Sequence, residues 1–269
     1  MDAWSSGQSK AMGSVLWESV IKYLELMEAD YFDLEYYDET NLQCWLDREK
    51  PILKQIPNTD VEFRFAVKFY TPDPGLLEEE YTRYLFALQV KRDLKTEALP
   101  CSDNTLALLA SYIVQAEIGD FLEDEYLDES YLSLHKFVPH QSPDLDLKIM
   151  EYHRQHIGQG PSEADLNLLD TARKVEQYGI RNFPAKGYYK DIVEFFFESR
   201  NECKGFWKKC IEHHAFFRCH TVKKLPRNKT RVVSRGSSYR YSGKTQKQLM
   251  EYVRENYVKK RPFERFIWQ

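Results

Sequence analysis

Three cysteines and three histidines between residues 203 and 220 are the side chains with the most capacity for chemistry. They are Cys203, Cys210, His213, His214, Cys219 and His220. Zinc sites usually draw on paired cysteines roughly two to four residues apart, whereas these cysteines lie seven and nine residues apart. On a helix, Cys203, Cys210 and His214 would share one side with Trp207. We therefore expect an apolar helix face here and no metal site.

A cysteine nucleophile beside a histidine is the second chemical possibility, with Cys210 and His214 one helical turn apart. Such a site needs a lowered thiol pKa and a third residue that orients the base, and the sequence carries no signal for either. The phosphate-binding patterns GxxxxGK[ST] and GxGxxG do not occur. The carboxylates of residues 78–80 and 123–125 are typical of solvated faces. The sequence therefore predicts no catalytic residue and no cofactor.

Positive charge near the C-terminal end gives the clearest functional signal. Residues 221–269 contain fourteen Lys or Arg and three Glu, a net charge of +11, whereas the rest of the chain has a net charge of −15. Each basic residue near an anionic bilayer contributes roughly 1 kcal/mol to binding. Six of them lie within thirteen positions and are the predicted lipid-binding residues: Lys223, Lys224, Arg227, Lys229, Arg231 and Arg235.

The basic tail allows other interpretations. In one interpretation the tail folds back on the acidic body of the protein. In the other it is solvated and mobile. Ser234 and Ser238 each follow an arginine by three residues, a spacing that basophilic kinases favour, so both are predicted phosphorylation sites. Each phosphate would add about −1.5 to −2 charges and weaken the attraction to lipid. Tyrosines interleaved with basic residues also occur in nucleic-acid-binding segments, but the acidic body argues against a nucleic-acid partner.

Composition sets the broad class of the protein. At 269 residues and 42% hydrophobic content, the chain can bury one large core or two to three smaller ones. No apolar run approaches the length of a membrane-spanning helix, so we expect a peripheral protein rather than a transmembrane one. Five scattered cysteines and a polar start without signal-peptide character favour a reducing, cytosolic environment.

The first section of the chain predicts a small roll of one helix and three strands. Helical spacing of apolar residues over 14–27 indicates a helix, with Ser14 as its N-cap. Aromatic residues make 31–38 and 43–47 strand candidates, and residues 50–56 a short helical turn. Residues 62–70 alternate strictly, with the phenylalanines on one face, which predicts a half-buried strand.

The middle section predicts a bundle of four amphipathic helices. Prolines and a glycine at 72–75 separate the last strand from a helix that runs to Leu94. Further helices are predicted after a cap at Ser102, from 144 to 156, and from an N-cap at Ser162 to Gly179. The first helix should present one face made of Leu77, Tyr81, Tyr84, Leu85 and Leu88.

The third section is short. Residues 191–199 predict one strand and residues 200–218 one helix. We expect no other strand between residues 180 and 190.

Several stretches together resemble the FERM superfamily, whose members are membrane-to-cytoskeleton adaptors. They are DYFDLEYYDE followed by CWLDREKPILKQI, EEEYTRYLFALQVKRDL with LLASYIVQAEIGDF, and ECKGFWKKCIEHHAFFR. The segment SRGSSYRYSGKTQKQ is similar to the FERM-adjacent region of band 4.1-like proteins, FERM-containing Rho exchange factors and some tyrosine phosphatases. The resemblance covers nearly the whole chain from Gly13 in collinear order. Within the superfamily, the chain most resembles the FERM-containing Rho exchange factors.

The resemblance implies an α+β protein of several lobes. Residues 12–70 would form a partial ubiquitin-like lobe, and residues 75–179 a helical lobe like acyl-CoA-binding protein. Residues 181–220 would be the last strand and helix of a lobe like pleckstrin-homology or phosphotyrosine-binding domains. Residues 221–269 would be the basic FERM-adjacent tail.

The resemblance also implies a function without catalysis. Such an adaptor would link cytoplasmic tails of plasma-membrane proteins, and phosphoinositides or other anionic lipids, to the cortical actin cytoskeleton. It would lie in the cytoplasm, at the cytoplasmic face of the plasma membrane and the cell cortex. Family members bind tail peptides in a groove beside the third-lobe helix, which makes Lys204, Trp207 and Lys208 the predicted partner-binding residues.

Two departures from the family pattern leave alternatives. The first lobe lacks its opening hairpin, and the third lobe lacks its earlier strands, so the chain resembles a truncated member. It would then be the regulatory part of a Rho exchange factor or a tyrosine phosphatase whose catalytic domain lies beyond Gln269. A third interpretation is an inert truncated isoform.

Overall fold

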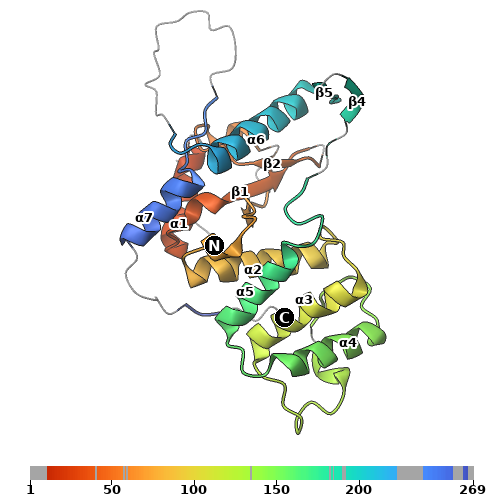
Figure 1. Cartoon of the computed structure of the whole chain (residues 1–269). Helices are drawn as coiled ribbons and strands as arrows, with labels where there is room; N and C mark the ends of the chain where they lie inside the picture. Colours follow the sequence, from red (N-terminus) through yellow and green to blue (C-terminus); the bar gives the residue numbers. More distant parts are fainter. Residues whose placement is uncertain are drawn as a thin grey trace, which may run out of the picture. The chain divides into compact units, whose positions relative to one another are not determined.

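The structure is a computed structural model, and it divides into two compact units. Unit 1 comprises Met1–Phe69 with Asn182–Asn256, and unit 2 comprises Tyr70–Arg181 with Tyr257–Gln269. The residues that the structure describes are 11–39, 41–56, 58, 60–133, 135–181, 183, 185–189, 192–222, 239–256 and 263–265. Helices and strands are mixed (Figure 1), which confirms the predicted α+β class. Within these residues no helix is both long and apolar enough to cross a membrane.

Unit 1 contains both sheets of the structure. Its helices and strands are α1 (Gly13–Leu24), β1 (Phe32–Tyr37), β2 (Gln43–Trp45), β3 (Arg64–Val67), β4 (Ala185–Tyr189), β5 (Ile192–Phe195), α6 (Arg200–Arg218) and α7 (Gln246–Asn256). Strands β2, β1 and β3 form an antiparallel sheet in that order. The predicted roll of one helix and three strands is thus present.

Helix α1 covers one face of this sheet. Trp17 stacks on Phe65 with ring centroids 6.2 Å apart, and Phe65 stacks on Phe32 at 4.9 Å. The helix begins at Gly13 and not at a serine cap. A Cβ on Gly13 would lie 2.6 Å from the Asp47 carbonyl oxygen, so this close approach requires glycine. The predicted Ser14 cap is wrong, because the first N–H groups of α1 donate to carbonyl oxygens of a neighbouring loop.

The second face of the sheet is also covered, by α6 (Figure 1). Five consecutive residues of β1, Phe32 to Tyr36, are therefore buried. The strand predicted over 62–70 is shorter than expected, because residues 62–63 and 68–70 lie outside β3. Strand β3 ends at Val67, and the next two N–H groups both donate to the Tyr31 carbonyl, at 2.9 and 3.1 Å. The Phe69 side chain consequently packs against Phe216 of α6.

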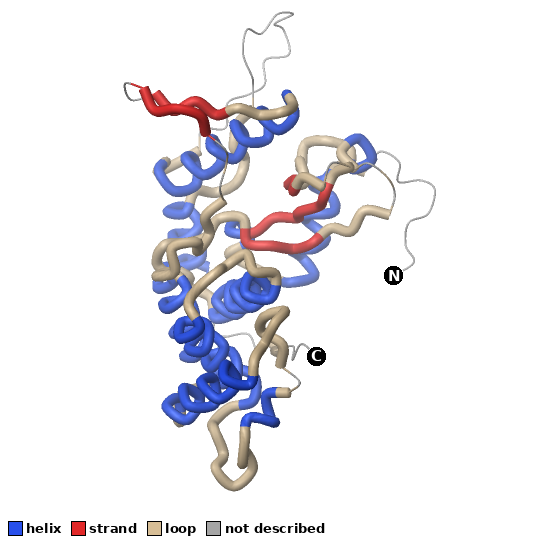
Figure 2. Tube along the Cα trace, turned by 90° about the vertical axis from the view of Figure 1, so that its right-hand side faces the viewer, coloured by secondary structure: helices blue, strands red, loops and turns tan. Residues whose placement is uncertain are grey.

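A second, two-stranded antiparallel sheet is formed by β4 and β5, beside the beginning of α6 (Figures 1 and 2). Strand β4 contradicts the expectation that no strand lies between residues 180 and 190. The stretch is short and contains a proline and a glycine, which hid its strand character from sequence analysis. Phe206 connects α6 to this second sheet, because its ring centroid lies 4.6 Å from that of Phe195 on β5.

The segment from residue 239 to α7 folds back on unit 1, one of the outcomes foreseen for the basic tail. Leu249 and Val253 are the buried residues of α7. Gln246 donates to the Tyr31 hydroxyl at 3.2 Å. Gly243 allows the backbone to approach, because a Cβ there would lie 2.7 Å from Asp30 Oδ1.

Unit 2 contains a helical bundle. Its helices are α2 (Glu80–Lys95), α3 (Asp103–Ile118), α4 (Pro143–His153) and α5 (Pro161–Ala172). Helix α3 is central and contacts the other three. The Ser102 side chain accepts a hydrogen bond from the Thr105 N–H, so the predicted cap is confirmed. At α5 the predicted cap is wrong by two residues, because Gly160 precedes Pro161 at the first helical position.

The predicted face of α2 needs a correction. Phe86, Val90 and Leu94 are buried, whereas Leu85 and Leu88 are only half-buried. Leu77 lies outside the helix, which starts at Glu80. The physical reason is that α2 packs against both α3 and α5, so its buried surface is broader than one stripe.

Candidate partner-binding cleft

Helix α6 positions the candidate site of unit 1. The Ser199 side chain accepts the Glu202 N–H at 3.2 Å and its hydroxyl donates to the Glu202 carboxylate at 3.1 Å, so Ser199 is the N-cap of the helix. The helix then runs for 19 residues to Arg218. Its beginning and end agree with the sequence prediction.

The buried face of α6 differs from the predicted one. Lys208, Glu212 and Phe216 follow one another at four-residue intervals and point to the sheet. Phe216 stacks on Phe69 at 4.3 Å between ring centroids and is fully buried. Cys203 and Cys210 are exposed. The expected apolar face of cysteines and histidine is therefore wrong, because the sheet presents charged groups that need charged partners.

Those charged groups form a buried network. The Lys68 ammonium lies 2.9 Å from Asp33 and 3.1 Å from Glu212, and Arg48 approaches Asp33 at 3.3 Å. Burial alone would lower the pKa of Lys68, but the two carboxylates outweigh it and raise the pKa. Tyr239 donates a hydrogen bond to Glu212. The network joins the sheet, α6 and the segment after residue 238.

A second contact between α6 and the sheet edge lies nearer the solvent. Lys208 approaches Asp47 at 2.9 Å, and Lys50 approaches the same oxygen at 2.8 Å. Burial opposes ionisation of Asp47, but hydrogen bonds from the two lysines lower its pKa to about 2. Asp47 is therefore a carboxylate throughout the physiological range and holds α6 to the sheet of β2, β1 and β3.

Between α6, β2 and the segment 239–243 lies a cleft of about 690 Å³. Its wall carries aromatic rings and charges of both signs, including Trp45, Phe196, Phe206 and Lys204. Phe196 is 56% exposed, which leaves an apolar surface at the cleft mouth. A cleft with apolar rings and separate charges of both signs suits a peptide better than a compact anion.

The three predicted partner-binding residues lie on α6 but in different surroundings. Lys204 is exposed and lines the cleft. Trp207 is half-buried, 6.0 Å from the Tyr239 ring, and Lys208 is held by Asp47. The predicted lipid-binding residues and phosphorylation sites lie outside the described residues: Lys223, Lys224, Arg227, Lys229, Arg231, Arg235, Ser234 and Ser238.

Sequence reasoning missed Asp47, Glu212 and Tyr239 as parts of this site. Each belongs to a different stretch of the chain, and no local pattern connects them. The four-residue spacing of Lys208, Glu212 and Phe216 is visible in the sequence, but charged residues are rarely buried, and the sequence favours the face that carries Trp207.

Most of the cysteines and histidines between residues 203 and 220 are exposed in the structure. Burial raises the pKa of the Cys210 thiol, the opposite of what a nucleophile requires. No group of three His, Cys, Asp or Glu residues among those described is placed to hold a metal ion.

Four family models match this chain in collinear order. They are the FERM N-terminal domain at residues 6–58, the FERM central domain at 72–183, the FERM C-terminal PH-like domain at 177–225 and the FERM adjacent region at 231–267. The chain belongs to the FERM superfamily. The predicted recognition is thereby confirmed, and the four-part division into residues 12–70, 75–179, 181–220 and 221–269 stays a prediction.

Curated relatives are similar over nearly the whole FERM chain. "FERM, ARHGEF and pleckstrin domain-containing protein 1" of Gallus gallus is 43% identical over 309 positions, which cover 95% of this chain and 29% of that protein. "FERM domain-containing protein 7" of Homo sapiens is 40% identical and is covered to 43% of its length. This chain thus spans less than half of either relative.

The length of these alignments carries information about the FERM lobes. An alignment of 309 positions exceeds the 269 residues of this chain, so at least 40 positions of the relative have no counterpart here. Which elements of the relative these positions form is not shown by the alignment length, so the missing hairpin and third-lobe strands stay a prediction. The match to the PH-like domain is correspondingly confined to residues 177–225.

A solved structure confirms the FERM-like fold. The FERM domain of Drosophila Merlin, in complex with its C-terminal domain, has a TM-score of 0.58 and 26% sequence identity with this chain. The similarity covers 67% of this chain and 64% of the Merlin chain.

Proposed function

We propose that this chain is a non-catalytic adaptor that links cytoplasmic tails of membrane proteins and anionic lipid to the cortical actin cytoskeleton. The observation that carries the proposal is the cleft beside α6, because it lies next to the helix that the resemblance assigns to partner binding. Its place would be the cytoplasmic face of the plasma membrane.

The protein partner in this proposal is an extended tail segment with an apolar anchor and an acidic group. The exposed Phe196 offers an apolar contact, and the exposed Lys204 offers a positive charge. Trp207 and Lys208 act indirectly, since their contacts with Tyr239 and Asp47 fix the position of α6. A partner therefore meets a helix that is already held in place, which lowers the entropic cost of binding.

The lipid partner in this proposal is a phosphoinositide-containing surface. The six basic residues from Lys223 to Arg235 would supply the attraction, and phosphorylation of Ser234 and Ser238 would reduce it. Membrane and tail peptide would then be bound together, so that each raises the effective concentration of the other.

Vesicle flotation tests the lipid half of the proposal. The full chain is mixed with phosphatidylcholine vesicles that contain phosphatidylinositol 4,5-bisphosphate. We expect the triple variant Lys223→Gln, Lys224→Gln, Arg227→Gln to float less and to lose part of its salt dependence.

A matched control changes the same number of charges at exposed lysines elsewhere, Lys22→Gln, Lys54→Gln and Lys95→Gln. Flotation of this control should equal that of the unaltered chain. Equal losses of flotation in both triple variants would mean that net charge, and not the position of the basic residues, determines binding. No loss of flotation in either variant would show that the tail does not contribute to lipid binding.

A second proposal is that the chain serves as the regulatory part of a Rho exchange factor. The printed name of the 43% identical relative includes an ARHGEF domain, and this chain spans 29% of that protein. Sequencing the transcript downstream of Gln269 tests it, because an exchange-factor domain would have to follow in the same reading frame.

A further inference from the structure

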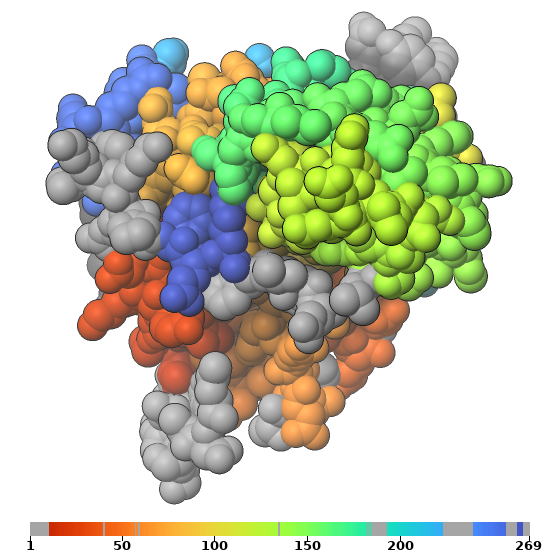
Figure 3. Space-filling view, turned by 90° about the horizontal axis from the view of Figure 1, so that it is seen from below, coloured from red at the N-terminus to blue at the C-terminus, as the bar shows by residue number. Residues whose placement is uncertain are grey.

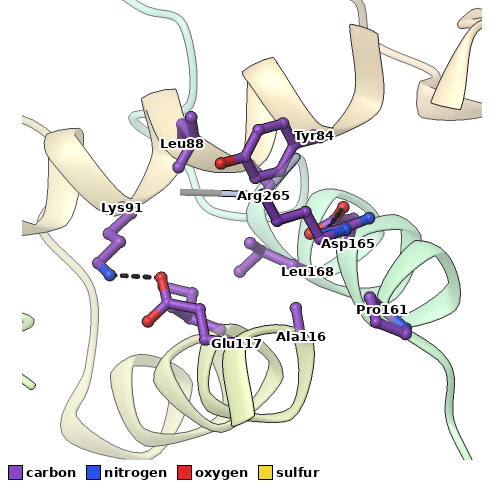
Figure 4. A pocket seen from close by; sticks show the side chains of 11 residues that line it. Tyr84, Leu88, Lys91, Ala116, Glu117, Pro161, Asp165, Leu168 and Arg265 are labelled. Carbon is purple, nitrogen blue, oxygen red and sulfur yellow. Dashed lines mark hydrogen bonds and ion pairs between the residues drawn. The ribbon is translucent and has the colours of Figure 1, made fainter. Parts of the chain in front are cut away.

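Unit 2 contains a cavity of its own between α2, α3 and α5, with a volume of about 260 Å³ (Figure 4). Leu88, Ala116 and Leu168 give it an apolar wall. One of its lining side chains, Arg265, comes from the far end of the chain, almost one hundred residues after the nearest helix of the bundle. A side chain distant in sequence therefore occupies part of a cavity in the helical bundle.

Arg265 is bound by charge and by ring contacts. Its guanidinium forms an ion pair with Asp165 on α5, with 2.8 Å between Nη1 and Oδ2, and lies 3.6 Å from Glu80 on α2. It also lies 5.0 Å from the centroid of the Tyr84 ring. A planar guanidinium can face two carboxylates and a ring together, whereas a lysine ammonium cannot stack in this way.

A second anchor lies two residues earlier. The Phe263 ring is 4.9 Å from Tyr81 and 5.3 Å from Tyr84, measured between ring centroids. Figure 3 shows the dark blue atoms of residues 263–265 beside the green atoms of α5. Phe263 and Arg265 therefore bind neighbouring positions along α2 and α5, one through rings and the other through charge.

A cation at this position stabilises the buried carboxylate of Asp165. The Asp165 side chain is only 3% exposed. Burial raises the pKa of Asp165 to about 6, although the positive charge of Arg265 acts to lower it. The negative charge of Glu80 raises this pKa further, and the positive charge of Arg83 lowers it. A buried carboxylate without a positive partner is unfavourable, so this site selects a ligand that brings one.

We propose that this cavity is a peptide-binding site that recognises an aromatic residue followed two positions later by arginine. Phe263 and Arg265 fill the site in cis, and a segment of the same pattern from a partner protein binds by displacing them. The cavity extends past Arg265 to the ion pair of Lys91 with Glu117, which are 2.5 Å apart. A longer partner segment therefore has space that the cis residues leave open. The site is distinct from the cleft and from the six predicted lipid-binding residues between Lys223 and Arg235.

Competition between the two segments gives a direct test. The probe is a fluorescein-labelled peptide of the sequence KRPFERF, residues 260–266 of this chain, and its binding to the full chain is followed by fluorescence anisotropy. The variant Arg265→Ala removes the cis guanidinium that competes with the probe for Asp165, so we expect it to bind the probe at least tenfold more tightly than the unaltered chain does. A probe with Ala in place of Phe263 and Gln in place of Arg265 should bind at least tenfold more weakly.

Two variants locate the binding within unit 2. Adding Asp165→Asn to Arg265→Ala should cancel the gain, because the charged partner of the guanidinium is lost. Arg173→Ala, a matched change at an exposed arginine of the same unit, should leave probe binding as in the unaltered chain.

Equal probe affinity of the unaltered chain and Arg265→Ala, or no binding to the variant, would overturn the proposal. Far-UV circular dichroism checks that each variant keeps its helices. If Arg265→Ala unfolds the bundle, Phe263→Ala takes its place, because that change leaves the ion pair of Asp165 intact. The proposal then requires Phe263→Ala to bind the probe more tightly than the unaltered chain, and equal affinity would overturn it.

Discussion

Replacing Lys68 by methionine should destabilise unit 1 strongly, because this lysine lies between two carboxylates in the interior. Its side chain is 6% exposed and its ammonium is 2.9 Å from Asp33 and 3.1 Å from Glu212. At an effective dielectric constant of about 20, each attraction at about 3 Å has a Coulomb energy of roughly 5 kcal/mol before desolvation is subtracted. Removing one partner of a buried ion pair costs about 3–5 kcal/mol in general. Because Arg48 still neutralises Asp33, we expect a loss of about 3 kcal/mol.

Urea unfolding followed by tryptophan fluorescence measures this loss. Trp17, Trp45 and Trp207 all belong to unit 1 and report on it; Trp4 and Trp268 lie outside the described residues and are replaced by Phe in every variant. With a slope of about 2 kcal/mol per molar urea, a loss of about 3 kcal/mol lowers the midpoint by roughly 1.5 M.

Two further variants isolate the cause. Lys54→Met removes an exposed lysine of the same unit and should change stability by less than about 0.5 kcal/mol. Adding Glu212→Leu to Lys68→Met removes the carboxylate that was left without its partner and should restore part of the loss. If Lys68→Met costs no more than Lys54→Met, the reasoning that joins α6 to the sheet through this network is refuted.

Three titrations test the electrostatics of single groups. Arg265→Ala should raise the pKa of Asp165 above its value of about 6, because the cation is lost while burial and Glu80 remain; carbon-13 NMR of the carboxyl group measures it. Asp47, with its pKa lowered from 3.8 to about 2, stabilises unit 1 above about pH 4, and this contribution disappears as the pH falls through 2. Asp47→Asn should therefore differ from the unaltered chain in urea unfolding at pH 5 and approach it at pH 2. Burial lowers the pKa of His156 from 6.5 to about 4, so unit 2 should lose stability as the pH falls from 6.5 toward 4. In His156→Asn this slope in thermal unfolding, followed by circular dichroism, should be smaller.

Local patterns predicted most helices and strands of this protein. The polar cap at Ser102 and the apolar run that follows it specify α3 within a few residues, and α6 begins and ends where the sequence predicts a helix over residues 200–218. The family resemblance added the order of the lobes. These features are readable because each depends on neighbours in the sequence.

The candidate sites depend on contacts that no local pattern contains. Lys68 and Glu212 look like solvated residues in the sequence, yet each is buried because the other, 144 positions away, supplies its counter-charge. Asp165 and Arg265 are separated by 100 positions in the same way. Strand β4 was missed because its composition is a poor strand signal and only its pairing with β5 stabilises it.

Amide hydrogen exchange of the full chain tests most directly the central claim that α6 packs on the sheet of β2, β1 and β3 as part of one cooperative unit. The account predicts that the amides around Glu212 and Phe216 exchange slowly, with an opening free energy close to that of β1, and that Lys68→Met lowers both together. An isolated helix of this length is only marginally stable in water. Fast exchange throughout α6 beside a protected β1 would contradict the account.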